Sequence, residues 1–257
     1  MKSGAGSTQA VDADLKPGYT WQTHLGEAIP FDAKYHEVPR TEIVSFIHRS
    51  PGVVLDVGCA GGATSRLIKQ KFPGTRVIGV EPNRDAARHA SQYLDKVLTK
   101  LLSQIDPEVD LEGCDIGLVL LLDVLEHIED PWRALSGLRQ LIGMNTRVLA
   151  SIPNVRNLST MHDLAAGKWE YLPNGVLDIT HLRFFTEKQI RELFLQTGYR
   201  ILAVDPLTNP ESMKRIVTAE RTNRVETARI AVDCESFVER EGLYAIQYVV
   251  DARKSEG

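Results

Sequence analysis

The chain has 257 residues, of which 43% are hydrophobic and 25% charged, and its formal net charge is -4. This balance is ordinary for a soluble globular protein, and the length suffices for one large domain or a domain with a cap. The slightly acidic net charge argues against a dedicated nucleic-acid-binding protein, because such proteins are usually basic.

Three cysteines, Cys59, Cys114 and Cys234, are widely spaced and odd in number. They form no metal-ligand pattern and favour a reducing compartment, so we expect a cytoplasmic protein. Residues 1–18 lack the apolar core of a signal peptide and are expected to form a flexible tail. The longest apolar run, Ile116–Leu122, is too short to cross a bilayer, so no membrane span is expected.

Residues 19–257 are expected to form a single domain. The aromatic residues within 19–31 favour packing against the edge of that domain, with a short lid as the alternative. Apolar positions recur at helical spacing over 33–48, which predicts a helix, and Pro39 is expected to lie in its first turn.

The stretch Val53–Gly62 starts as a run of aliphatic residues, which predicts a strand buried on both faces. It then breaks at Gly58, Gly61 and Gly62, and a helix is expected over 63–72. Glycines allow a tight turn and the close approach of a ligand. A strand, a glycine turn and a helix in this order predict a nucleotide-type pocket, the alternative being a glycine turn without a ligand.

A second strand is expected over 76–80, and it ends at Glu81. An acidic residue at the end of the second strand, roughly 20 residues after the glycine turn, typically binds ribose hydroxyls. A carboxylate can accept two hydrogen bonds from a vicinal diol, so the residue type suits this role.

The glycine spacing bears on which nucleotide binds. A dinucleotide fingerprint requires Gly-x-Gly-x-x-Gly, whereas Cys59 and Ala60 separate Gly58 from Gly61 here. This spacing disfavours a nicotinamide-dependent oxidoreductase, which we keep as an alternative.

The remaining chain alternates between strands and helices. Further strands are expected over 96–99, 116–121, 147–152, 199–205 and 243–252, of which the last could be antiparallel. Helices are expected over 83–93, 130–142 and 186–197, an acidic surface loop over 107–113, and one or two surface helices over 209–230. This alternation predicts an α/β fold with a doubly wound, mostly parallel sheet. Residues 154–185 show no clear elements and are expected to form a cap inserted after the fifth strand.

Ligands of such sheets bind at the carboxyl ends of the strands. By this rule we expect one crevice to be lined by the glycine turn, Glu81 and residues 123–127 and 153–154. His127 is the best candidate for a general base there, because its ordinary pKa lies near neutrality. Packing of His127 against the following helix is an equally weighted alternative.

His181 is the rival base. Asp178 precedes it by one turn and could orient its ring, and Arg183 could hold an acceptor carboxylate or phosphate. The alternative is an internal network that fixes the cap to the domain. Neither histidine has a second ligand at metal spacing, so no metal is expected. Trp169 and Tyr171 could line an acceptor pocket or be part of the core.

The run from Asp56 to Gly62, Glu81 and the segment Asp123–His127 resemble the corresponding motifs of class I S-adenosylmethionine-dependent methyltransferases. More specifically, they resemble the branch that includes ubiquinone-pathway O-methyltransferases and bacterial methyltransferases of small molecules and surface polysaccharides. Further segments that resemble this branch are Lys34–Arg40, Ser151–Val155, Gly167–Tyr171 and Leu177–Thr186.

The resemblance implies a Rossmann-like fold with a seven-stranded sheet and S-adenosylmethionine as cofactor. It implies that Asp56 and the glycine turn hold the methionine part, Glu81 the ribose, and Asp123 with Val124 the sulfonium region, while Tyr35 closes over the cofactor. The full set of expected cofactor-binding residues is Tyr35, Asp56, Gly58, Cys59, Ala60, Gly61, Gly62, Glu81, Pro82, Asp123 and Val124.

Two positions depart from the family pattern. Ala60 replaces a usual glycine, and Thr99–Leu102 lack the carboxylate that often contacts the adenine. The expected function is methyl transfer from S-adenosylmethionine to an oxygen or nitrogen of a small-molecule acceptor. A non-catalytic S-adenosylmethionine-binding protein is a second alternative, and the oligomeric state stays open.

Overall fold

The computed structural model describes residues 37–255 of the chain. The expected tail (1–18), the aromatic segment (19–31) and Tyr35 lie outside the described residues. The helix expected over 33–48 is shorter within the described part, where α2 spans only Thr41–Ser45 and residues 37–40 are not helical.

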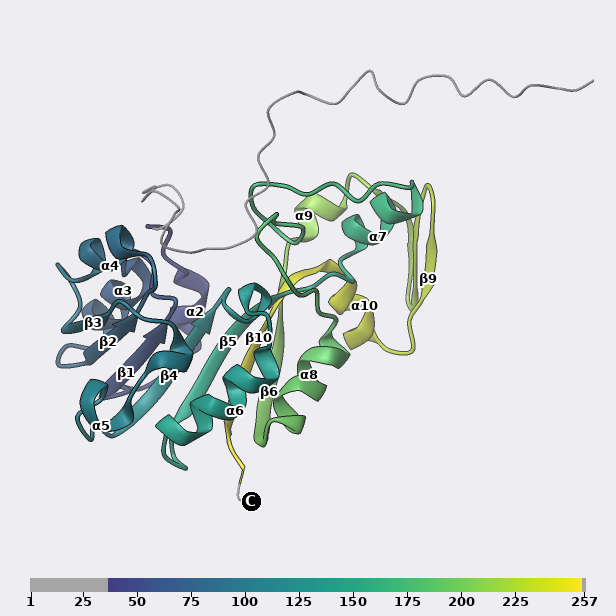
Figure 1. Ribbon diagram of the computed structural model, residues 1–257. Helices are drawn as coiled ribbons and strands as arrows, with labels where there is room; N and C mark the ends of the chain where they lie inside the picture. Colours follow the sequence, from purple (N-terminus) through teal and green to yellow (C-terminus); the bar gives the residue numbers. More distant parts are fainter. Residues whose placement is uncertain (1–36, 256–257) are drawn as a thin grey trace, which may run out of the picture.

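The centre of the molecule is a seven-stranded sheet with the order β3-β2-β1-β4-β5-β10-β6 (Figure 1). Its strands are β1 (Val53–Val57), β2 (Arg76–Val80), β3 (Lys96–Leu98), β4 (Ile116–Leu122), β5 (Arg147–Pro153), β6 (Tyr199–Thr208) and β10 (Ala245–Lys254). β10 runs antiparallel to both β5 and β6, whereas the pairs among β1 to β5 are parallel. The expected α/β, mostly parallel, doubly wound sheet is confirmed.

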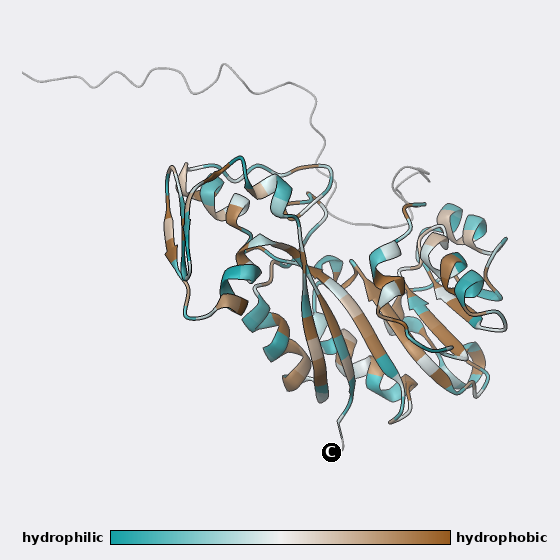
Figure 2. Cartoon of the chain, turned by 180° about the vertical axis from the view of Figure 1, so that it is seen from behind, coloured by the Kyte–Doolittle hydropathy of each residue, from teal (hydrophilic) through white to brown (hydrophobic). Residues whose placement is uncertain are grey.

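Helices cover both faces of this sheet. On one face pack α6 (Pro131–Leu141) and α8 (Glu187–Gln196), and on the other α2, α3 (Ala63–Lys71) and α4 (Arg84–Ala90). Successive residues of a strand point to opposite faces, so Val54 joins one core and Leu55 the other. Figure 2 accordingly shows the central strands as largely hydrophobic along their length.

Capping residues explain where several helices begin. Asp130 accepts a hydrogen bond from Arg133 N, and Pro131 then opens α6. Thr186 and Gln189 form a capping box at α8. These starts agree with the sequence-based expectation.

Two expectations about surface segments are wrong. The acidic stretch 107–113 contains a short helix, α5 (Pro107–Asp110), capped by Asp106. Residues 209–230 hold only one short helix, α9 (Pro210–Met213), and otherwise form part of a separate antiparallel sheet, β7-β8-β9, whose strands are β7 (Val217–Arg221), β8 (Arg224–Thr227) and β9 (Ala231–Asp233).

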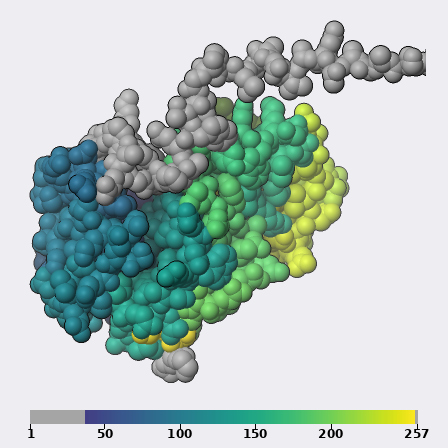
Figure 3. Space-filling model, viewed as in Figure 1, coloured from purple at the N-terminus to yellow at the C-terminus, as the bar shows by residue number. Residues whose placement is uncertain are grey.

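The small sheet packs with two helices at the end of the molecule remote from β3 (Figure 1). These are α7 (Leu158–Ala165), within the expected cap, and α10 (Phe237–Tyr244), which the sequence did not reveal. Leu158, Val225 and Leu243 share one hydrophobic cluster there, so residues from 154–185 pack with residues from well beyond that range. In the space-filling view the yellow residues of this part lie along the right-hand edge of the molecule (Figure 3).

No helix within residues 37–255 is both long and apolar enough to traverse a membrane.

Candidate functional site

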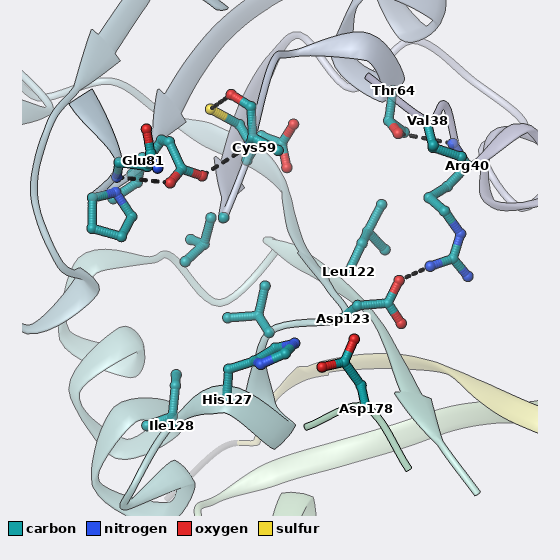
Figure 4. Close-up of a pocket in the computed structure, with 18 of the residues that line it drawn as sticks. Val38, Arg40, Cys59, Thr64, Glu81, Leu122, Asp123, His127, Ile128 and Asp178 are labelled. Atoms are coloured by element: carbon teal, nitrogen blue, oxygen red, sulfur yellow. Dashed lines mark hydrogen bonds and ion pairs between the residues drawn. The ribbon is translucent and has the colours of Figure 1, made fainter. Parts of the chain in front are cut away.

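A cavity of about 730 Å³ lies at the carboxyl ends of β1, β2 and β4. Its volume is in the range of small-molecule and cofactor sites. Figure 4 shows two groups of side chains in it: Cys59 and Glu81 in one part, and His127 and Asp178 in another. We refer to residues 56–62 with Glu81 as the glycine-turn side, and to His127, Asp178, Thr180 and His181 as the histidine side.

The glycine turn joins β1 to α3 through a left-handed backbone. Gly58, Ala60 and Gly62 have φ values of 69°, 47° and 81°. A Cβ atom on Gly58 would lie 2.8 Å from Cγ2 of Val124, so no side chain fits at this position without a shift of Val124. The turn therefore brings bare backbone to the cavity wall.

Ala60 holds a conformation that an L-residue adopts at a cost of roughly 1–2 kcal/mol. Its amide donates a 2.9 Å hydrogen bond to Oε2 of Glu81, which helps to hold this conformation. Alanine can thus stand where the family usually has glycine.

Glu81 is almost fully buried at the end of β2. Besides the bond from Ala60, its Oε1 accepts a 2.9 Å hydrogen bond from the amide of Asn83 (Figure 4). Glu81 lines the cavity, and a carboxylate oxygen can accept more than one hydrogen bond.

Asp56 is the second buried carboxyl group of the glycine-turn side, and it lines the cavity. Ser65 Oγ donates a 2.7 Å hydrogen bond to its Oδ2. Burial, reinforced by the charge of Glu81, nevertheless raises the pKa of Asp56 to about 7. A cationic ligand group beside Asp56 would favour its ionised form.

Asp123 lies at the end of β4 with a φ of 55°, an uncommon backbone conformation for an aspartate. Its Oδ2 forms an ion pair with Arg40, and its Oδ1 accepts a 2.5 Å hydrogen bond from Gln247 Nε2. Arg40 also bonds through its backbone amide to Thr64 Oγ1 at 3.0 Å. This network joins four distant segments at one wall of the cavity, through Arg40, Thr64, Asp123 and Gln247.

The sequence analysis singled out neither Arg40 nor Gln247. The only available signal was that Arg40 ends a segment resembling the methyltransferase branch. Gln247 is one of several polar residues in β10, so its role became apparent only through the pairing of β10 with β5.

On the histidine side, His127 and His181 stack edge to face with ring centroids 4.8 Å apart. His127 lies in the short 3-10 helix η2 (Leu125–His127), and its Nδ1 lies 3.2 Å from both the carbonyl oxygen and the hydroxyl of Thr180. Burial, together with the neighbouring His181, lowers the pKa of His127 to about 4, and burial lowers that of His181 as well. Both rings are therefore neutral near pH 7.

Asp178 does not orient His181 as expected. It accepts hydrogen bonds from the amide and hydroxyl of Thr180, at 2.8 and 2.6 Å, whereas His181 Nδ1 bonds to the carbonyl of Val176 at 3.1 Å. Asp178 acts on His127 instead, because the Thr180 hydroxyl that it fixes lies against that ring.

Glu126, which the sequence analysis passed over, has a fully buried side chain beside these histidines. Neither carboxylate oxygen has a hydrogen-bond partner among the described residues. One potential donor atom from each of Glu126, His127 and His181 lies within 4.8 Å of the others. Linear spacing hid this cluster because His181 comes from a loop far along the chain.

Of the expected acceptor-binding residues, some line the cavity and others do not. Asp178 lines the cavity, as does the loop 173–175, whereas Trp169, Tyr171 and Arg183 are not among the described residues that line it. Arg183 donates hydrogen bonds to the carbonyls of Leu182 and Glu129, outside the cavity.

The segment after Asp178 is also tied to η2 by backbone bonds. The amides of Leu182 and Arg183 both bond to the carbonyl of Glu126, at 2.8 and 3.0 Å. These bonds hold the segment against η2, but the side chains of Asp178, His181 and Arg183 do not bond to one another, and the histidines still face the cavity.

Most of the expected cofactor-binding residues line the cavity. The described ones that line the cavity are Asp56, Gly58, Cys59, Ala60, Glu81, Pro82, Asp123 and Val124. Gly61 and Gly62 do not line it. After β3, Lys100 and Leu101 line the cavity, and Lys100 Nζ pairs with both oxygens of Asp110 at 2.8 and 2.6 Å.

Comparisons with known proteins agree with this geometry. A family model described as a methyltransferase domain matches residues 31–204. The ubiquinone biosynthesis O-methyltransferase of Vibrio campbellii is 26% identical over 213 residues, which cover 77% of this chain and 86% of that enzyme. The malonyl-(acyl-carrier protein) O-methyltransferase of Geobacter sulfurreducens is 25% identical over 158 residues, covering 60% of this chain and only 58% of that enzyme.

A solved structure shares the fold. The 1,6-didemethyltoxoflavin-N1-methyltransferase of Burkholderia thailandensis, with its substrate and S-adenosylhomocysteine bound, is 17% identical with a TM-score of 0.53, covering 88% of this chain and 82% of that one. Together these matches favour the methyltransferase over the nicotinamide-dependent oxidoreductase. The chain belongs to the methyltransferase domain family, with the Rossmann-like fold and the S-adenosylmethionine dependence of class I methyltransferases.

Proposed function

We propose that this protein transfers a methyl group from S-adenosylmethionine to an oxygen or nitrogen of a small-molecule acceptor. The observation that carries the proposal is a single cavity with two chemically distinct parts. Buried carboxyl groups and bare backbone line one part, and neutral imidazoles line the other.

The residues of the glycine-turn side fit the cofactor. Asp56 would hold the ammonium group of the methionine part, and Glu81 the ribose hydroxyls. Gly58 and Val124 lie in contact range in the cavity wall, where a Cβ on Gly58 would displace Val124. The cofactor, when bound, supplies an electrophilic methyl group on a sulfonium.

The protein then contributes alignment, exclusion of water and removal of a proton. Alignment of the reacting groups can supply about 7–11 kcal/mol of the barrier, and a positioned base a further factor of about 10²–10⁴. We propose that the histidine side removes the proton from the acceptor. Engagement of Nδ1 of His127 with Thr180 leaves its Nε2 as the nitrogen with a free lone pair.

The relatives that resemble this sequence support oxygen as the acceptor atom. The Vibrio and Geobacter proteins are both O-methyltransferases by name. The Burkholderia protein, an N1-methyltransferase, shares only the fold, so nitrogen stays within the proposal.

Isotope transfer would test this proposal. Purified protein is incubated with S-adenosylmethionine bearing a labelled methyl group and pools of small phenols, hydroxy acids and amines. We expect label in at least one acceptor pool, and loss of that label in the Glu81→Ala variant. Cofactor binding without label in any acceptor would favour the non-catalytic alternative.

We further propose a cytoplasmic location and a small-molecule rather than nucleic-acid partner. The net charge of -4 and the absence of disulfides among the three cysteines support this.

A further inference from the structure

We propose that Glu126, His127 and His181 form a binding site for a divalent transition-metal ion of the zinc type, at the histidine side of the cavity. The site itself stands on the geometry of these three side chains. Its role in the reaction rests on the proposed function.

The first observation is the isolation of Glu126. Its side chain has no exposed surface, and both of its oxygens lack a hydrogen-bond partner within residues 37–255. Buried carboxyl groups in proteins are almost always hydrogen-bonded, paired with a cation or coordinated to a metal. Glu126 therefore lacks the hydrogen-bond partner that such a group needs. Arg40 acts on it through its charge, and His127 and His181 place potential ligand atoms within 4.8 Å.

The second observation is how the two imidazoles are held. Nδ1 of His127 faces the carbonyl of Thr180, and Nδ1 of His181 faces the carbonyl of Val176, at 3.2 and 3.1 Å. A carbonyl can only accept, so each Nδ1 carries the proton and each Nε2 keeps its lone pair. Metal-binding histidines are typically fixed in this way, by a bond from the other ring nitrogen to a carbonyl or carboxylate.

The third observation is distance. The donor atoms of the three residues lie within 4.8 Å of one another. Zinc holds imidazole nitrogen and carboxylate oxygen at about 2.0–2.2 Å, so each donor would move inward by less than about 1 Å to reach an ion among them. Neither oxygen of Glu126 forms a hydrogen bond with the two histidines, so the arrangement suits an ion between the side chains.

Two imidazoles and one carboxylate are a donor set of catalytic zinc sites, which keep one position open for a ligand. His127 and His181 line the cavity, whereas Glu126 lies behind them. The open position would thus face the cavity. An ion there would attract an acceptor oxygen and favour the loss of its proton to solvent water, which is the step that a methyl transfer to oxygen requires. With the ion bound, His127 would serve as a ligand and solvent water would replace it as the proton acceptor.

The test is a calorimetric titration of the full chain, without a polyhistidine tag and after dialysis against a chelator, with ZnCl2. We expect one ion per chain and at least a 100-fold loss of affinity in Glu126→Gln and in His181→Asn. His48→Asn is the matched control, because His48 is exposed and remote from the cluster in sequence, and it should bind zinc like the wild type.

Binding of S-adenosylhomocysteine by each variant reports whether the fold survives, since the residues assigned to the cofactor lie in the other part of the cavity. Intact cofactor binding with no zinc bound at the cluster, or with equal zinc affinity in wild type and Glu126→Gln, would overturn the metal site and leave the proposed function in place. Failure of the wild type to bind the cofactor would overturn the proposed function, while the zinc titration would still decide the metal site.

Discussion

The two sides of the cavity are built differently. The glycine-turn side comes from consecutive residues, 56–62, and one carboxylate from the adjacent strand, and it is held in part by backbone bonds such as that from Gly58 N to the carbonyl oxygen of Val80. The histidine side brings η2 together with a loop about fifty positions later, and it is held by side-chain contacts such as that of His127 with Thr180. A local, backbone-built site can be read from sequence, whereas one assembled from distant segments cannot.

The largest effect is expected at Gly58. Replacing it with valine places a side chain against Val124 in a left-handed backbone, so we expect at least a 100-fold loss of affinity for S-adenosylhomocysteine by calorimetry. Gly113→Ala is the matched control, because Gly113 has a similar φ of 67° but open space around it. A Gly58→Val protein that binds as well as Gly113→Ala would show that the turn does not form the cofactor wall.

The raised pKa of Asp56 leads us to expect that the stability of the protein depends on pH. Its pKa is raised to about 7 in the folded protein from an ordinary value of 3.8, so between these values the folded state retains a proton that the unfolded chain has released. Stability should therefore fall as pH rises through this window, by roughly 4 kcal/mol at most. Urea unfolding from pH 4 to 8 measures this slope.

The Asp56→Asn variant is the comparison for that experiment. It removes the contribution of Asp56 and should make the fall in stability between pH 4 and 7 shallower. Glu126, whose pKa burial raises to about 8, should still contribute to the slope. Identical slopes in wild type and variant would contradict the assignment of the raised pKa to Asp56.

The ion pair of Arg40 with Asp123 lies in the wall of the cavity. Arg40→Met leaves Asp123 with the neutral partners Gln247 and Ser151 and should lower the free energy of unfolding by about 1–3 kcal/mol. Arg88→Met, which removes an exposed pair with Asp85, should change it by less than about 1 kcal/mol. Equal effects of the two substitutions would mean that the Arg40 network adds nothing beyond a surface pair.

The smallest effect is expected at Ala60. Glycine would relieve the left-handed strain but would lose conformational entropy on folding, so Ala60→Gly should change stability by no more than about 1 kcal/mol. Cofactor affinity should stay within a few-fold of the wild type. A tenfold loss would indicate that the alanine methyl group itself contacts the ligand.

The same contrast explains what could be predicted from sequence. β2 was expected over 76–80 and spans Arg76–Val80, because its aliphatic run and the glycines around it act over a few residues. The start of α6 followed from Asp130 and Pro131, and that of α8 from the capping box, which are equally local signals.

Segments whose stability comes from distant partners were missed. β7 and β8 are polar on their outer face, so their sequence appeared to favour surface helices, and only the burial of Val225 against Leu158 and Leu243 makes them strands. Glu126 was missed for a related reason, since its significance depends on His181.

The central claim is that the glycine-turn side binds the cofactor, and calorimetric titration of the wild type with S-adenosylhomocysteine tests it most directly, with NADH as the competing ligand. We predict one molecule of S-adenosylhomocysteine per chain, binding lost in Gly58→Val, and no heat with NADH. No heat with S-adenosylhomocysteine, or equal binding by wild type and Gly58→Val, would contradict the claim.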